Sequence, residues 1–428
     1  MKINMVEVSR HYLDLPQIKC HQVGKMAKWI NLHQELLEII FDLCLLPYQI
    51  RMRSVCKTWR LILKTPRELP WLMMLPKKNQ EEDHRHQDPD ARAFFSLSEQ
   101  KEDHHPDACA FFSLSKQKIH TIHLPEIQGK RCRGSFQNGW LMIIDELDIF
   151  LFHPWSKKRL ELLHRSTLDF KYHSCIKHLG IPYMKMMRPH RIRKAALSDD
   201  CKLMVVVVYE SDMVQLAFYR IGDDAWTDIV VPPGPMDVIY HNGQFYCITM
   251  WGGVYLVHIE NGNSYAKRLT ENMKEPFGGL YLVPDMLTDT NIMFVILRER
   301  VTRANVHETR DTIHFHIYKF PLGEKGPLDQ EKEVVNKLIK VESLGDRVIF
   351  LGYNSPITVM ASEFPGLKGN CIYFTDDSGA SYANGPGDCG VFNVEDGTVE
   401  QLFAHGYHPA FAPPIWFATP PYSSYQRD

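Results

Sequence analysis

The sequence predicts a mainly β protein in which a small N-terminal unit of three helices precedes a β-propeller. Two observations lead to this prediction. A dense apolar stretch with helical spacing occupies residues 32–63, and from about residue 108 onward short apolar segments of strand length recur between turn signals. These segments fall into groups of about four, as propeller blades do. Six blades fit the grouping best, and five or seven stay open as alternatives.

The first predicted helix is apolar around most of its circumference. Within the positions 36 to 44, the apolar residues are Leu36, Leu37, Ile39, Ile40, Phe41, Leu43 and Cys44. One face of such a helix can cover a small local core, and the other face needs cover from another protein. The pair Leu46-Pro47 ends this helix, because Pro lacks a backbone N–H and disfavours helix in the residue before it.

Two further short helices are expected. The second runs from Pro47, a residue suited to the first turn of a helix, to Arg53. The third carries its apolar residues at helical spacing: Val55, Cys56, Trp59, Ile62 and Leu63. Three short helices bury too little apolar surface to make a robust domain alone.

This stretch resembles the F-box, a helical adaptor that docks on the Skp-type subunit of cullin–RING ubiquitin ligases. The motif is carried by Leu32-His33-Gln34-Glu35, Ile40-Phe41, Leu45-Leu46 and Val55-Cys56-Lys57-Thr58-Trp59-Arg60. His33 and Tyr48 stand where the family usually has Pro and Asp, both at helix starts. The alternative is a small helical cap packed on its own domain.

The F-box resemblance covers residues 28–66 and implies a set of residues that dock on the Skp-type subunit. These are Leu32, Leu36, Ile40, Phe41, Leu46, Pro47, Val55 and Trp59. Some of them must pack the local three-helix core instead, and the sequence does not separate the two groups.

Composition limits the compartment and the partners. The chain has 428 residues, enough for two domains, and a net charge of −2 that favours neither nucleic acid nor an anionic membrane as a partner. No apolar window approaches the length of a membrane helix, and the N-terminus lacks the apolar centre of a secretory signal. Ten cysteines without a CxxC pair indicate reduced thiols in a cytoplasmic or nuclear protein.

Four segments are expected along the chain. Residues 1–25 carry little periodicity and are expected to be a disordered extension before the F-box at 28–66. Residues 67–107 are expected to be a linker with a duplicated loop, because residues 89–101 return almost unchanged as residues 106–118. Two copies do not make a solenoid, so one copy is expected to be looped out. The second copy leads directly into another strand pattern and is the expected native strand, so the propeller is expected to span 108–420.

Closure of the ring would remove the exposed sheet edges of such a fold. An early strand, residues 111–114 or 119–124, is expected to pair with the last strands, and residues 414–417 are expected to join there. Asn-Gly and Asp-Gly steps indicate tight hairpins at residues 241–244, 260–263 and 395–398. A β-sandwich is the alternative architecture, but about twenty strands are too many for one sandwich.

The β region resembles the kelch-like "domain of unknown function 295" that follows plant F-boxes. The longest matching segment is residues 364–377, FPGLKGNCIYFTDD, and shorter ones are residues 69–73, 129–135 and 343–347. Together with the F-box, the resemblance covers roughly residues 28–405. It implies that the propeller recruits a target protein.

No catalytic, cofactor or metal site is expected. The glycine-rich and serine motifs of nucleotide-binding proteins and serine hydrolases do not occur. Asp376-Asp377 is expected to be a turn feature, and His314 and His316 share a strand face but lack the third ligand that zinc needs. The basic cluster at residues 185–194 is expected to be a solvated loop between blades. The mouth of the central channel is expected to lack a close acid–base pair.

The sequence therefore favours a non-catalytic adaptor. Its F-box would bind a Skp-type subunit, and through it cullin and RING subunits, while the propeller holds an unknown target protein for ubiquitin transfer. Two alternatives stay open: a protein-binding propeller that joins no ligase, and a propeller enzyme with an F-box-like cap. No nucleic acid or membrane is expected as a partner, and target binding is expected through loops with aromatic and Arg residues.

Overall fold

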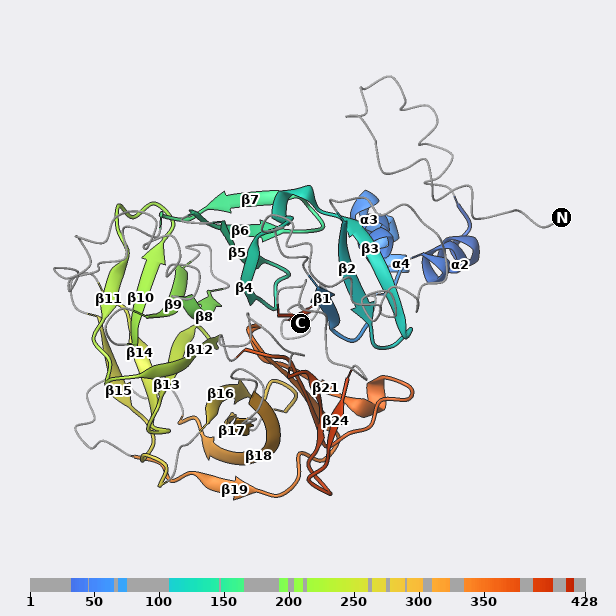
Figure 1. Cartoon of the computed structure of the whole chain (residues 1–428). Coiled ribbons are helices and arrows are strands. Elements are labelled where there is room, and N and C mark those ends of the chain that lie inside the picture. Colours follow the sequence, from blue (N-terminus) through green and yellow to red (C-terminus); the bar gives the residue numbers. More distant parts are fainter. Residues whose placement is uncertain are drawn as a thin grey trace, which may run out of the picture. The chain divides into compact units, whose positions relative to one another are not determined.

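In the computed structural model the chain forms two compact units, Met1–Arg67 and Glu68–Asp428, each of which is described by itself (Figure 1). The structure describes residues 32–44, 46–64, 68–74, 108–145, 148–164, 192–198, 204–210, 214–260, 264–274, 278–288, 291–302, 310–323, 335–377, 388–402 and 413–418. The predicted N-terminal extension and the first copy of the duplicated segment lie outside these residues, so what the sequence predicts for them stays a prediction.

Three helices are described in the N-terminal unit: α2 (Gln34–Leu43), α3 (Leu46–Val55) and α4 (Lys57–Ile62). The interruption between α2 and α3 confirms the predicted break. Helix α3 contains Pro47, because Pro is tolerated in a first helical turn. The helix ends at Val55, beyond the predicted end at Arg53. Cys56 caps α4, since its Sγ accepts a hydrogen bond from the Trp59 N–H at 3.4 Å. The Gln49 side chain of α3 donates to the Phe41 carbonyl of α2 at 2.9 Å.

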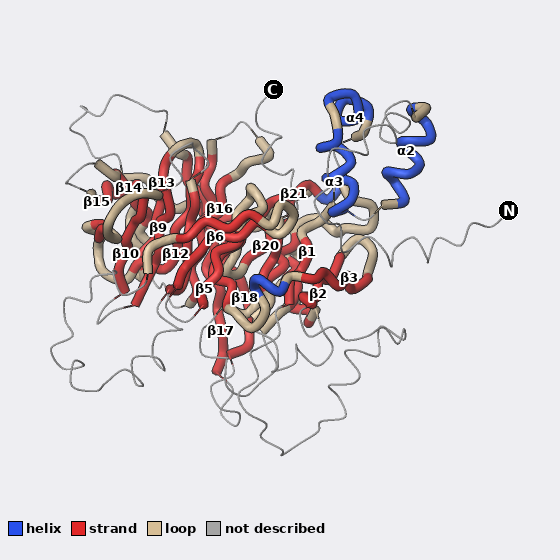
Figure 2. Tube along the Cα trace, turned by 90° about the horizontal axis from the view of Figure 1, so that it is seen from above, coloured by secondary structure: helices blue, strands red, loops and turns tan. Residues whose placement is uncertain are grey.

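The second unit is a β-propeller, and its described strands form six sheets, one for each blade (Figures 1 and 2). Blade 1 contains β1 (Trp71–Met74), β2 (Ala108–Ser113), β3 (Lys118–His123) and β25 (Ile415–Phe417). Blade 2 contains β4 (Arg131–Ser135), β5 (Leu141–Asp145), β6 (Asp148–His153) and β7 (Lys158–Glu161). Blade 3 contains β8 (Ile192–Leu197), β9 (Met204–Glu210), β10 (Val214–Arg220) and β11 (Thr227–Ile229).

The remaining blades follow in chain order. Blade 4 contains β12 (Pro235–His241), β13 (Gln244–Thr249), β14 (Val254–His258) and β15 (Tyr265–Arg268). Blade 5 contains β16 (Gly279–Pro284), β17 (Ile292–Thr302), β18 (Arg310–Pro321) and β19 (Ile339–Val341). Blade 6 contains β20 (Arg347–Leu351), β21 (Ile357–Met360), β22 (Cys371–Phe374), β23 (Gly390–Asn393) and β24 (Val399–Gln401). Two short 3₁₀ helices, η2 (Pro125–Ile127) and η5 (Ala361–Glu363), lie between strands.

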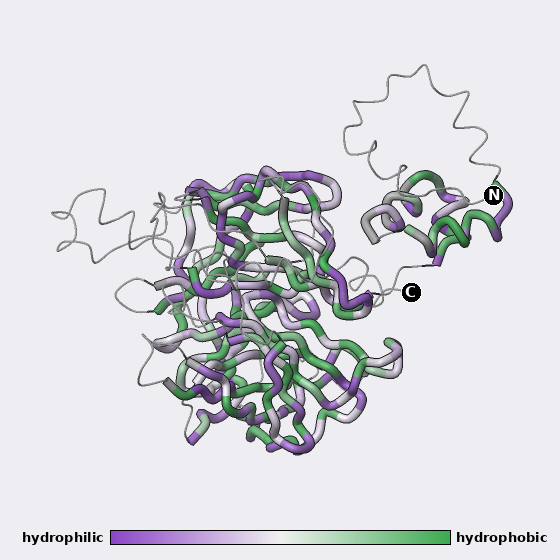
Figure 3. The backbone as a smooth tube through the Cα atoms, turned by 45° about the vertical axis from the view of Figure 1, so that its right-hand side comes forward, coloured by the Kyte–Doolittle hydropathy of each residue, from purple (hydrophilic) through white to green (hydrophobic). Residues whose placement is uncertain are grey.

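Apolar layers between neighbouring blades form the core of the propeller. In β9, Val205 and Val207 pack with side chains of blade 2, whereas Val206 and Val208 pack with side chains of blade 4. Because successive side chains of a strand point to opposite faces, one strand contributes to two layers. A strand in the middle of a blade therefore needs a continuous apolar run. Figure 3 shows such hydrophobic stretches running through the blades, with hydrophilic stretches at many of the turns.

The ring closes through the C-terminal strand. β25 pairs antiparallel with β1, with Trp71 opposite Phe417 and Met73 opposite Ile415, and β1 pairs on its other side with β2. The expected strand at 414–417 does join the first blade. Its partner, however, is β1 and neither of the two early strands named from the sequence. The six sheets and this closure also exclude the β-sandwich.

Residues 71–74 differ from the predicted linker, because they form a strand at the centre of blade 1. All four side chains of Trp71–Met74 are buried, so their sequence shows neither alternation nor the length that identifies a strand from pattern. The second copy of the duplicated segment does form a strand, β2, and continues into β3, as predicted. At residues 241–244 the predicted tight hairpin is also present, with Asn242 and Gly243 at φ 50° and 80°.

Candidate functional site

Helix α2 divides its apolar residues between two faces. Leu37 and Phe41, four residues apart, are 1% and 4% exposed and form the local core with Trp59 and Leu63. Leu36 and Ile39 lie outside this inner face of the helix and are 53% and 55% exposed. The helix therefore has a buried inner face and, among the described residues of its unit, an apolar face that stays exposed.

The other two helices add to this uncovered surface. Val55 at the end of α3 is 47% exposed, and Leu61 of α4 is 87% exposed. We call the following residues the exposed apolar set: Leu36, Ile39, Ile40, Val55 and Leu61. Apolar side chains that gather on one surface mark interaction sites. The three members on α2 make this set the candidate docking surface of the unit.

The structure separates the predicted docking residues into groups that the sequence could not separate. Leu36, Ile40 and Val55 are exposed, whereas Phe41 and Trp59 are core residues. The remaining three are Leu32, which packs against the core, and Leu46 and Pro47, whose side chains lie outside the described part. The burial of Phe41 and Trp59 therefore does not support a docking role for these two residues.

Two exposed residues were missed from the sequence, Ile39 and Leu61. Helical spacing contains a signal for both. Ile39 lies three residues after Leu36, so the two share a face, and Leu61 lies two residues after the buried Trp59, which places it on the opposite side of α4. The resemblance to a family motif drew attention to motif positions instead.

In the propeller, the first group of candidate functional residues lies near the axis. β25, β4, β8, β12 and β16 contact one another in this order around the axis. The segment between β20 and β21, residues 352–356, reaches across the ring from blade 6, and we call it the crossing segment. Its Gly352 carbonyl accepts a hydrogen bond from Lys194 Nζ of β8 at 2.6 Å. Its Ser355 N–H donates to the Ser135 carbonyl of β4 at 2.8 Å.

The position of Lys194 contradicts the prediction that residues 185–194 form a solvated basic loop. Residues 192–194 belong to strand β8, Lys194 is buried, and its Nζ lies 3.5 Å from Asp237 Oδ1 of β12. Burial raises the pKa of Asp237, and the nearby ammonium opposes this shift. A close acid–base pair therefore lies near the axis, against expectation. The rest of the basic cluster, residues 185–191, lies outside the described residues.

A second buried cluster links blades 5 and 6. Arg298 of β17 is 0% exposed, and its Nη2 lies 2.8 Å from Asp388 Oδ2, while its Nη1 lies 3.3 Å from Asp377 Oδ1. Arg300 pairs with the same Asp377 carboxylate, which also accepts a hydrogen bond from Tyr281 Oη at 2.7 Å. Asp377 is thus part of a buried inter-blade cluster and not the turn feature expected from sequence.

The electrostatics of this cluster favour a structural role. Burial alone would raise the pKa of Asp377, but Arg300 and Arg298 outweigh it and hold the pKa below the usual value. Burial raises the pKa of Tyr281 to about 12. The Asp377 carboxyl therefore stays ionised and the Tyr281 hydroxyl stays neutral at physiological pH. This suits a permanent link between the two blades rather than a proton-transfer site.

Two histidines and the metal-binding potential of the described residues complete the candidate chemistry. His314 and His316 of β18 lie on one face, with ring centroids 4.7 Å apart, and His316 Nε2 is 3.3 Å from Glu299 Oε2. Within the described ranges, no group of three or more His, Cys, Asp or Glu side chains is arranged to hold a metal ion. No helix in those ranges is long and apolar enough to cross a membrane.

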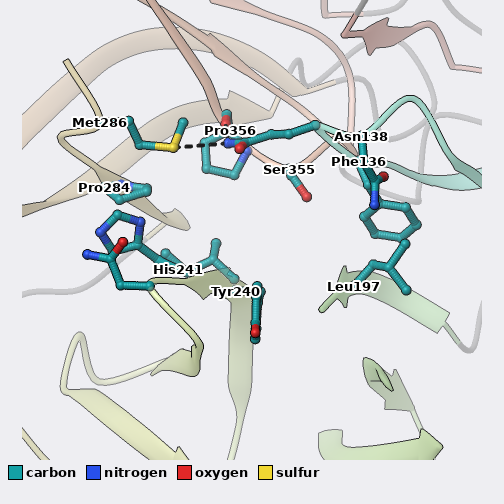
Figure 4. A pocket seen from close by; sticks show the side chains of 12 residues that line it. Phe136, Asn138, Leu197, Tyr240, His241, Pro284, Met286, Ser355 and Pro356 are labelled. Carbon is teal, nitrogen blue, oxygen red and sulfur yellow. Dashed lines mark hydrogen bonds between the residues drawn. The ribbon is translucent and has the colours of Figure 1, made fainter. Parts of the chain in front are cut away.

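A pocket with a volume of about 80 Å³ opens where the innermost strands end. It is lined by residues of blades 2 to 6: Phe136, Gln137, Asn138, Leu197, Ile239, Tyr240, His241, Asn242, Pro284, Met286, Ser355 and Pro356. Figure 4 shows His241 and Pro284 on one side and Phe136 and Leu197 on the other, with Ser355 and Pro356 between them. We call this the axial pocket.

Comparison with known proteins agrees with both units. The F-box domain model matches residues 29–71, and the KIB1-4 β-propeller model matches residues 111–393, more than half of the chain. Among curated relatives from Arabidopsis thaliana, F-box protein At2g05970 is 21% identical over 381 residues, which are 83% of this chain and 86% of the relative.

Two further Arabidopsis thaliana F-box proteins match over shorter lengths. At5g55150 is 27% identical over 50% of this chain, and At2g26160 is 26% identical over 33% of it. The chain spans only 55% and 39% of the lengths of these two relatives. The propeller family model covers most of the ring that the structure shows, and the F-box model covers all three helices. The chain therefore belongs to the F-box proteins that carry a KIB1-4 β-propeller.

Proposed function

We propose that this protein is the substrate-recognition subunit of an SCF-type cullin–RING ubiquitin ligase. Its F-box docks on a Skp-type subunit, which connects it to the cullin and RING subunits, and its propeller recruits a target protein. The observation that carries this proposal is the exposed apolar set, which lies outside the small core of Leu37, Phe41, Trp59 and Leu63.

The energetics of this surface support a stable protein partner. Covering one exposed aliphatic side chain contributes about 1.5–3 kcal/mol. Several such side chains together can offset the loss of translational and rotational freedom on association, which costs roughly 4–15 kcal/mol. A partner that covers α2 and α4 would also complete a unit whose own core is too small for robust stability.

The propeller is proposed as a non-catalytic binding module. Arg298, Arg300, Asp377 and Asp388 are paired with one another between blades, and Lys194 is paired with Asp237. In this proposal these buried pairs connect neighbouring blades and take no part in converting a substrate. Ubiquitin transfer would then be performed by the other subunits, in the cytoplasm, the nucleus or both.

The proposal is tested by co-purification with a Skp-type subunit. The double variant Leu36→Asp/Ile39→Asp places two carboxylates on the exposed face of α2 without touching its core, so binding should be lost while the thermal midpoint stays unchanged. Val230→Asp is a matched control, because Val230 is 74% exposed in the propeller unit. Retained binding by the double variant would contradict the proposal. Binding without ubiquitin transfer in a reconstituted ligase would favour the non-ligase alternative.

A further inference from the structure

The size of the axial pocket limits what it can hold. Its volume of about 80 Å³ is well below the ~300–1,000 Å³ of small-molecule sites. For comparison, an engineered apolar cavity of about 150 Å³ binds benzene. The size of the axial pocket therefore suits one side chain of a larger partner better than a whole cofactor or metabolite. The crossing segment sets this limit, because Ser355 and Pro356 occupy space at the axis and form part of the lining.

The lining of the axial pocket carries no formal charge. It contains no Asp, Glu, Lys or Arg, and burial lowers the pKa of its one histidine, His241, which is therefore neutral at pH 7. Asp285, next to two lining residues, is already paired with Arg347 at 2.7 Å. A charged side chain that entered would lose its hydration and find no opposite charge, which is strongly unfavourable.

The pocket also offers hydrogen bonds that the protein itself does not use. The imidazole of His241 and the hydroxyl of Ser355 have no hydrogen-bond partner among the described residues, and they come from different blades. A neutral imidazole has one donor and one acceptor, and a hydroxyl has both. Phe136, Leu197 and Met286 supply apolar surface beside these groups. Such a lining matches a short apolar stem with an uncharged polar end.

We propose that the axial pocket receives one uncharged polar side chain from an extended segment of the target protein. This rests on the proposed function, because it names where the propeller holds its target. The segment would lie across the mouth of the axis, where turns from five blades can contact the residues on either side of the inserted one. Recognition would then depend on one anchor in a pocket with near-neutral contacts around it, as in many protein interfaces.

The test uses a random-peptide display library panned on the purified full chain, followed by binding measurements with the enriched peptides. The blocking variant Ser355→Arg fills the pocket with a charged side chain. The hydrogen bonds that Ser355 makes with Ser135 and with the Asn354 side chain use its backbone N–H and carbonyl, so the substitution leaves both groups in place. His241→Phe keeps an aromatic ring, which is one ring atom larger than imidazole, and removes both hydrogen-bonding groups. Thr227→Arg adds the same charge on β11, at an exposed position away from the pocket. Thermal midpoints of all variants establish that they are folded.

The expected result is a set of peptides that share Asn, Gln, Ser or Thr at one position. Replacing that residue with Asp or Lys should weaken binding at least tenfold, and so should Ser355→Arg and His241→Phe, whereas Thr227→Arg should not. Failure to enrich any peptide would overturn the proposal. So would a shared charged residue, or undiminished binding to Ser355→Arg. Co-purification with the Skp-type subunit is scored separately, so failure of the ligase role and failure of the pocket give different outcomes.

Discussion

The two units of this protein use apolar side chains in opposite ways. In the propeller, a strand such as β9 buries Val205 to Val208 against both neighbouring blades, and the ring closes on itself through β25. In the F-box, α2 buries Leu37 and Phe41 but leaves Leu36 and Ile39 exposed. The described strands of the propeller close on themselves, whereas the described helices of the F-box leave apolar side chains exposed. This difference supports the two roles that we propose, a rigid platform and a docking element.

The largest effect is expected from opening the ring. Removing residues 413–428 deletes β25, and with it Trp416, a fully buried side chain whose truncation alone costs about 3–5 kcal/mol. It also exposes one edge of β1. We expect loss of the cooperative thermal transition of the propeller, followed by near-UV circular dichroism. Removing only residues 419–428 is the control, and a transition preserved in the longer truncation would show that closure contributes little.

Breaking the link between blades 5 and 6 should have the next largest effect. Asp388→Ala leaves the buried Arg298 without its nearest carboxylate, which we expect to lower the free energy of unfolding by about 3–5 kcal/mol. Adding Arg298→Met removes the uncompensated charge, so the double variant should recover part of the loss. Asp224→Ala, at an exposed position in the turn after β10, serves as the control in urea denaturation. If the double variant is no better than Asp388→Ala, charge pairing is not the reason for the loss.

The same cluster predicts a pH dependence. The pKa of Asp377 is held below its usual value in the folded state, so its contribution to stability is present above the unfolded pKa of about 3.9 and is lost as pH falls through the folded pKa. The free energy of unfolding should therefore fall on acidification below about pH 4. In Asp377→Asn this decrease should be smaller, since one titrating group is gone. An equally steep decrease in the variant would assign the effect to other carboxylates.

The smallest effect on stability is expected in the exposed apolar set. Leu61 is 87% exposed, so Leu61→Ser should change the free energy of unfolding by no more than about 0.5 kcal/mol. Leu37→Ala, on the same unit but in its core, should cost about 2–5 kcal/mol. Affinity for the Skp-type subunit, measured by isothermal titration calorimetry, should fall for Leu61→Ser even though the free chain is as stable as before. Unchanged affinity would remove Leu61 from the docking surface.

Local pattern was sufficient to predict most of the fold. Strand length, β-branched residues and Asn-Gly turns identify most of the blades, because a propeller repeats one simple unit whose strands pair with their neighbours in sequence. β1 escaped prediction, because four consecutive buried residues between uninformative segments give no period. Its position beside β25 depends on contact between residues more than 340 positions apart, Met73 and Ile415.

The sites were less predictable than the fold. The family motif located the F-box helices, but which residues turn inward depends on how three helices pack, and Phe41 and Trp59 prove to be core. Arg298 meets Asp388 across 90 positions, and Lys194 meets Gly352 across 158. No local pattern marks partners at such separations. The axial pocket likewise combines turns of five blades, each of which reads as an ordinary turn in sequence.

The central claim is that a Skp-type subunit completes the F-box while the propeller is already complete. Amide hydrogen exchange of the full chain, measured with and without a Skp-type subunit, tests it most directly. Exchange in α2, α3 and α4 should slow by at least tenfold when the subunit is added, and exchange in the strands of the six blades should stay as it was. Unchanged exchange in the three helices, or new protection only in the blades, would contradict the claim.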